Sequence, residues 1–189
     1  MTPLLALQAL PPIPDWTELH PLVIHFPIAL LLVAPLFILV GIVMNSEDGR
    51  PFLITALALM VLGTLGTVMA VLTGEAAAEV AHRTTGMAAV LELHQELAEI
   101  TRDIFGLLSV IFAAILFVPR FLRRRTSPAA ARLLPMAFLL FYVAGTVVLV
   151  NTAHNGGRLV HEFGAHAFVA PTAQAVNGQS ADRETKHDR

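Results

Sequence analysis

The sequence has no cysteine among its 189 residues, and only 14% of these residues are charged. The absence of cysteine excludes disulfides, iron–sulfur clusters, cysteinyl zinc sites and a haem attached through Cys-x-x-Cys-His. Twelve Lys and Arg against fourteen Asp and Glu give a formal net charge of −2, which excludes nucleic acid as an expected partner. Gly-x-Gly-x-x-Gly and Walker motifs are also missing, so the sequence offers no nucleotide-binding loop.

Apolar residues are abundant, at 56% of the chain, against roughly 45–50% in a soluble domain. A hydrocarbon core of about 30 Å takes roughly 20 apolar helical residues, and four runs are long enough. They are 22–43, 52–72, 104–121 and 133–153. These runs contain no charged residue except Arg120. The prolines of the first and fourth runs, at positions 27, 35 and 135, require that packing satisfies the carbonyls they free. The sequence therefore predicts an all-α fold, a four-helix transmembrane bundle whose third and fourth helices extend beyond the membrane on the outer side.

Arginines are concentrated on one side of the predicted bundle. The first connection contributes Arg50, and the third connection, residues 119–132, contributes five more. Only Arg83, Arg102 and Arg158 are expected near the helices on the opposite side. The positive-inside rule therefore places the 119–132 loop in the cytoplasm and both ends of the chain outside.

Two segments of different composition flank the predicted four-helix membrane domain, residues 20–169. Residues 1–19 contain no basic residue, unlike a secretory signal, and are interpreted as an extracytoplasmic segment before a retained first helix. Residues 170–189 are polar, mixed in charge and without periodicity, which is typical of a disordered extracytoplasmic tail.

Seven of the eight histidines are expected to gather at the outer end of the bundle. In an up-down-up-down arrangement, the start of the first helix, the start of the third and the end of the fourth share one face of the membrane. The seven are His20, His25, His82, His94, His154, His161 and His166. The eighth, His187, lies in the tail and is expected to have no role.

Helical spacing reduces the number of histidines that could act together as ligands. At about 100° per residue, His154 and His161 share one stripe if the fourth helix continues through the glycines at 156 and 157. The third helix has no breaker back to about residue 87 and so carries His94. His20 and His25 lie about 140° apart on a regular helix. We expect His25 to face the bundle, because His20 precedes a proline and reads as a helix-start residue.

Inward histidines from neighbouring helices suit axial ligation of a non-covalent haem in a helical bundle. The candidate ligands, for haem iron or another metal, are His25, His94, His154 and His161. Arg158 and Arg102 are candidates to bind the haem propionates. Either His25 or His94 pairs with His154, and a second pair involves His161, so one or two haem b groups fit. The leading hypothesis is a b-type cytochrome-like electron-transfer protein rather than a stand-alone enzyme, with a quinone or a periplasmic c-type cytochrome as partner.

Two other interpretations use the same end of the molecule. Glu75 and Glu79, after a Gly74 expected to end the second helix, combine with His94 and His161 into a copper or zinc site. Alternatively, the chain is a structural subunit of a larger membrane complex that anchors a periplasmic redox partner through its acidic outer surface and tail.

The opening of the first run, His-Pro-Leu-Val-Ile-His-Phe-Pro-Ile at residues 20–28, resembles a known family. Together with Thr73-Gly74 and the late glycine pair, it is similar to bacterial four-helix membrane domains of unknown function that open with His-Pro-x-x-Val-His-Phe-Pro-Ile. The resemblance covers roughly residues 20–169 and implies a multi-pass protein of the bacterial inner (cytoplasmic) membrane. Such domains are sometimes joined to cytochrome c-like segments, which favours electron transfer by association.

Overall fold

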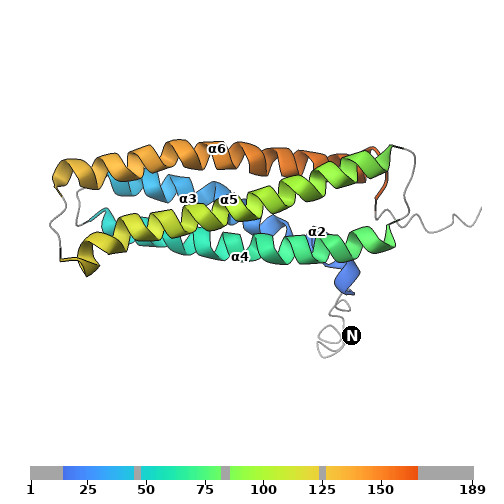
Figure 1. Ribbon diagram of the computed structural model, residues 1–189, viewed down its shortest axis with the longest axis horizontal. Helices are drawn as coiled ribbons and strands as arrows, with labels where there is room; N and C mark the ends of the chain where they lie inside the picture. The colour runs from blue at the N-terminus through green and yellow to red at the C-terminus, as the bar shows by residue number, and fades with distance from the viewer. Residues whose placement is uncertain (1–14, 45–47, 82–85, 124–126, 166–189) are drawn as a thin grey trace, which may run out of the picture.

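The computed structural model describes residues 15–44, 48–81, 86–123 and 127–165, and within these ranges every regular element is helical. Four long helices lie side by side, preceded by two short ones (Figure 1). The elements are η1 (Trp16–Glu18), α2 (His20–Val23), α3 (His25–Val43), α4 (Arg50–Val80), α5 (Met87–Phe121) and α6 (Pro128–His161). Four helices, with α2 and α3 counted as one, are long and apolar enough to cross a membrane. The predicted four-helix transmembrane bundle is confirmed.

Each long helix packs against two others: α3 and α5 both contact α4 and α6. The start of α2, the end of α4, the start of α5 and the end of α6 therefore lie at the same end of the bundle, the right-hand end of Figure 1. We name this the histidine end. The predicted tail, residues 170–189, and most of the predicted N-terminal segment lie outside the described residues.

The middle of the bundle is filled by aromatic and branched side chains. Phe112 of α5 stacks on Phe138 of α6, with ring centroids 4.7 Å apart. Tyr142 of α6 is fully buried, and its hydroxyl donates a hydrogen bond of 2.7 Å to the Leu31 carbonyl of α3. That carbonyl would normally accept from residue 35, which is a proline without an N–H. Tyr142 thus satisfies the carbonyl that Pro35 frees, as membrane helices require.

The first spanning segment is broken between α2 and α3, at Ile24. Pro27 has no N–H to donate to the Val23 carbonyl, so the hydrogen-bond ladder is interrupted there. Its ring packs closely on α4, where a Cβ built on Gly66 would lie 3.1 Å from Pro27. The break lets α2 lie against α4 at the histidine end.

Three predicted helix limits can be compared with the structure. The start of α5 at Met87 and the continuation of α6 through Gly156 and Gly157 are confirmed. The prediction that Gly74 ends the second helix is wrong, because α4 continues to Val80. The alanines and glutamates that follow Gly74 are strong helix formers and extend the helix by two turns.

Candidate functional site

A cavity of about 620 Å³ lies at the histidine end, between α2, α3, α4, α5 and α6. Its size is within the range of about 300–1,000 Å³ that is typical of ligand pockets. Small residues make up much of its wall: Ala70, Gly74, Ala77, Ala98, Ala153 and Gly156. The polar side chains that line it are His20, His25, Glu75, Gln95, His94, Glu99, His161 and three threonines.

His20, at the start of α2, is half-buried and directed at α4. Its Nδ1 lies 2.9 Å from the Ala70 carbonyl oxygen and 3.3 Å from the Thr73 hydroxyl. The Thr73 hydroxyl itself donates to the Met69 carbonyl, at 2.8 Å. Because a carbonyl only accepts, Nδ1 of His20 carries the proton, and in the neutral ring Nε2 carries the lone pair.

His94, two turns into α5, is also half-buried and is anchored on α6. Its Nδ1 lies 2.9 Å from the Thr152 carbonyl oxygen, so here too Nδ1 donates and Nε2 carries the lone pair of the neutral ring. The Thr152 hydroxyl is 2.8 Å from the Thr101 hydroxyl and 3.1 Å from the Leu97 carbonyl. These contacts hold α5 and α6 in register next to the ring.

The two rings lie next to each other in the cavity wall, edge to face. The centroids of His20 and His94 are 6.2 Å apart, and the ring planes are at 81°. Each ring also lies over a glycine of the neighbouring helix. A Cβ built on Gly74 would lie 2.9 Å from Cε1 of His20, and one built on Gly156 would lie 2.9 Å from Cε1 of His94. The structure thus brings together one histidine from the first spanning segment and one from the third.

The other candidate histidines are exposed. Nδ1 of His25 donates to the Pro21 carbonyl of its own segment, at 2.7 Å, and His25 reaches only the cavity wall. The expectation that His25 rather than His20 packs into the bundle is therefore wrong; the break at Ile24 turns His20 onto α4. His161 also lines the cavity with an exposed side chain, and His154 does not line it. His82, His166 and His187 lie outside the described residues.

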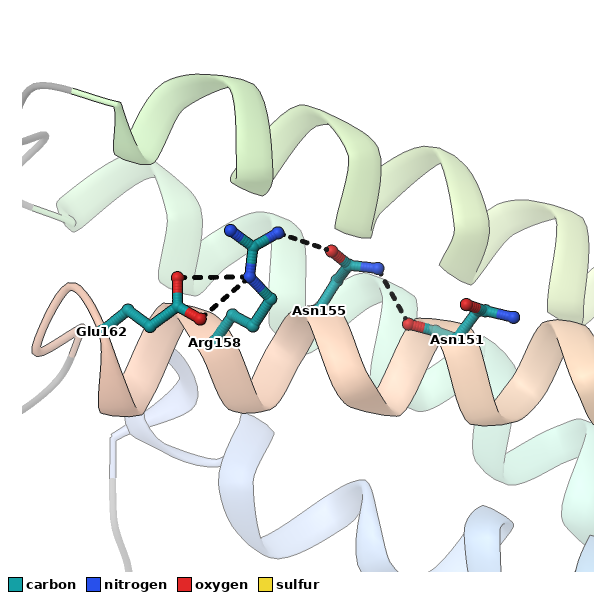
Figure 2. Close-up of polar contacts among 4 residues, drawn as sticks. All are labelled: Asn151, Asn155, Arg158 and Glu162. Atoms are coloured by element: carbon teal, nitrogen blue, oxygen red, sulfur yellow. Dashed lines mark hydrogen bonds and ion pairs between the residues drawn. The ribbon is translucent and has the colours of Figure 1, made fainter.

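Neither predicted propionate partner lines the cavity. Arg102 pairs with the adjacent Asp103, at 2.8 Å between Nε and Oδ1. Arg158 donates to Glu162 at 3.0 Å and to Asn155 at 3.4 Å, forming a ladder along α6 that Figure 2 shows. The hydrogen bond from Arg158 lowers the pKa of the Glu162 carboxyl. Both guanidinium groups are thus engaged with carboxylates of their own helix or its end.

The predicted site of carboxylates and histidines is not assembled as a group. Glu75 lines the cavity, but Glu79 does not. Across the part of the chain that the structure describes, no three His, Asp or Glu side chains come together in a way that could hold a metal ion. Among the described residues, the histidines that come together are His20 and His94.

Sequence reasoning missed the role of His20 and of the residues that receive the two rings. The only sequence signal is that Gly74 and Gly156 both lie at the level of the histidines, and small residues surround both of them. Each glycine follows by four residues the carbonyl to which a ring donates. This relation becomes visible only once the helix pairing is known.

No curated protein and no solved structure matches the chain. One family does match, over residues 17–168, which include α2 to α6 and the whole cavity. The description of this family, a predicted membrane protein, agrees with the four apolar helices of the chain. The chain belongs to the family described as "Predicted membrane protein (DUF2231)".

Proposed function

We propose that the protein is a membrane-anchored, b-type cytochrome-like electron-transfer protein that binds haem b through His20 and His94. The convergence of two half-buried histidines from different spanning segments on one cavity is the observation that carries this proposal. A metal ion held between two imidazole nitrogens, with bonds of about 2.0 Å on each side, separates the ring centroids by about 6 Å. The centroids of His20 and His94 are 6.2 Å apart.

The hydrogen bonds of the two rings support the same assignment. A metal-ligating histidine usually donates its other N–H to a carbonyl or carboxylate, which fixes the tautomer and the orientation of the ring. Nδ1 of His20 and Nδ1 of His94 each donate to a backbone carbonyl at 2.9 Å. In the proposed complex, Nε2 of each ring is the nitrogen that would bind iron.

The cavity suits a flat, largely apolar group. Small residues from α4, α5 and α6 leave its volume of about 620 Å³ open beside the two rings. Two ligands are sufficient for haem, because the macrocycle supplies the other four donors, whereas a bare copper or zinc ion generally needs more protein ligands. In the described part of the chain, no third His, Asp or Glu joins the pair.

Haem bound here would supply a one-electron couple. The chain's own residues orient the two imidazoles, through the Ala70 and Thr152 carbonyls. They also limit access of water, since Leu91, Leu149 and Leu159 pack around the cavity and are almost fully buried. Burial and hydrogen bonding of this kind are the features by which a protein tunes the potential of a bound haem.

We further propose that the histidine end faces outward from a bacterial inner membrane, with the arginine-containing loop after α5 in the cytoplasm. Exposed acidic side chains gather near the cavity on α4 and α5: Glu75, Glu79, Glu92, Glu96 and Glu99. Complementary charge speeds the encounter of redox proteins. The proposed partners are therefore a basic periplasmic c-type cytochrome on the aqueous side and a quinone on the lipid side, within a larger membrane complex.

The test is an absorption spectrum of the full chain, purified in detergent from haem-supplemented cells. We expect a Soret band and an α band that sharpens on reduction with dithionite. His20→Ala and His94→Ala should each remove most of the bound haem, whereas His154→Ala, at an exposed position outside the cavity, should retain it. A colourless protein would refute the proposal. Stoichiometric copper or zinc without porphyrin would replace it with the metal-ion alternative.

A further inference from the structure

Gly74 of α4 and the ring of His20 form a specific contact. The ring donates from Nδ1 to the carbonyl of Ala70, and Gly74 lies four residues later, on the same face and one turn along. The ring therefore lies along the helix surface, with Nδ1 at the carbonyl and Cε1 above the glycine. A Cβ on Gly74 would come within 2.9 Å of Cε1 and 3.1 Å of Nδ1.

Gly156 of α6 repeats this arrangement for His94. The ring donates from Nδ1 to the carbonyl of Thr152, and the glycine again follows that carbonyl by four residues. A Cβ on Gly156 would lie 2.9 Å from Cε1 and 3.4 Å from Nδ1. Two histidines from different spanning segments are thus held by the same combination of carbonyl and glycine, on two different helices.

We propose that Gly74 and Gly156 are positioning residues of the haem site. The absence of a side chain at each glycine lets the imidazole lie flat on the helix while keeping its hydrogen bond, and this fixes the separation and direction of the two ligands. The inference deepens the proposed function and rests on it for the identity of the cofactor. The packing of the two rings on the glycines does not depend on haem and can be tested in the haem-free protein.

Close packing on glycine recurs in these helices, at Gly41, Gly63 and Gly66, but the close side chains there are those of leucine, proline and phenylalanine rather than a histidine ring. Gly157 follows directly on α6, and a Cβ built there meets nothing within 4 Å. A Cβ on Gly106, in the middle of α5, meets only Thr64, at an ordinary 3.9 Å. A ring over Gly74 or Gly156 cannot rotate away from a new methyl group without losing its hydrogen bond. Alanine should therefore be costly at these two positions and harmless at Gly157.

The first experiment is a double-mutant cycle on the haem-free full chain in detergent, read as Tm. We expect Gly156→Ala to lower Tm in the unsubstituted protein. In a His94→Ala background, the same change should leave Tm unchanged or raise it, because alanine favours the helix once the ring is gone. Gly156→Ala should be additive with His20→Ala, and Gly157→Ala should not lower Tm. An equal loss from Gly156→Ala with and without His94 would overturn the proposal.

The second experiment measures haem affinity by titration into the same variants. Changes to groups that orient a metal ligand typically cost about 10–100-fold in affinity, and we expect a loss of this size for Gly74→Ala and Gly156→Ala. Gly106→Ala, outside the cavity, is the control and should keep the affinity of the unsubstituted protein. If the unsubstituted protein binds no haem but the Tm cycle shows coupling, the proposed function fails. The packing of each histidine ring on its glycine is then still supported. If Gly74→Ala and Gly156→Ala bind haem with unchanged affinity and spectrum, the positioning role fails and the proposed function stands.

Discussion

Replacing Tyr142 by Phe tests how the bundle tolerates a proline in its first spanning helix. The hydroxyl of Tyr142 donates to the Leu31 carbonyl at 2.7 Å, and this carbonyl has no donor in its own helix because position 35 is proline. Phenylalanine keeps the ring and its edge-to-face contact with Phe105, whose centroid is 5.3 Å away. The substitution therefore removes one hydrogen bond and leaves one buried carbonyl unsatisfied.

The magnitude follows from the surroundings of that carbonyl. An unsatisfied buried polar group costs about 1–3 kcal/mol, and hydrogen bonds between helices in membrane proteins average about 0.6 kcal/mol with a maximum near 1.7. Because Leu31 has no alternative donor and Tyr142 is fully buried, we expect Tyr142→Phe to lower the free energy of unfolding by about 1–2 kcal/mol.

The assay is equilibrium unfolding of the full chain in mixed detergent micelles, in two backgrounds. Pro35→Ala restores an N–H to the Leu31 carbonyl, so in that background Tyr142→Phe should cost clearly less. Thr146→Val is the matched control, since it removes a hydroxyl that donates to a carbonyl of its own helix. An equal cost of Tyr142→Phe with Pro35 and with alanine would refute the reasoning, because the two residues would then be independent.

Two further predictions concern charge and orientation. Arg158→Gln should leave haem content unchanged, because the guanidinium pairs with a carboxylate and does not line the cavity; a colourless variant would contradict this. Since the ion pair lowers the pKa of Glu162, any stability it gives is present at neutral pH and lost on acidification, so the Tm values of Arg158→Gln and the unsubstituted protein should converge in acid. The absence of native cysteine allows the topology to be mapped with Asp15→Cys and Ser127→Cys, both at exposed positions. An impermeant thiol reagent applied to intact spheroplasts should label only Asp15→Cys, and the opposite pattern would reverse the proposed orientation.

The number and extent of the spanning helices could be predicted because hydropathy acts over long stretches. The runs around 104–121 and 133–153 lack interior breakers other than prolines that packing tolerates, and the helices that contain them have 35 and 34 residues, more than the roughly 20 that a hydrocarbon core takes. The behaviour of Gly74 could not be predicted from propensity alone, since the residues after it continue α4. The cost of a glycine there is offset by the strong helix formers that follow.

The choice of histidine could not be predicted, because apolar membrane helices carry little information about which face is inward. The first spanning segment is hydrophobic all round, so its sequence does not distinguish His20 from His25. Spacing predicted that His154 and His161 share a stripe of the helix, but it did not predict which way that stripe faces. Both side chains are exposed in the structure. Direction is decided by contacts with other helices, which a single sequence does not contain.

The origin of the two rings has a consequence for biogenesis. His20 is synthesised before α4, on which it packs, and His94 of α5 is synthesised before α6, on which it packs. A chain stopped before α6 is inserted would have both imidazoles but would lack the Thr152 carbonyl that anchors His94. The site is therefore assembled only after α6 has been inserted, and a haem bound there would report that all four helices were in place.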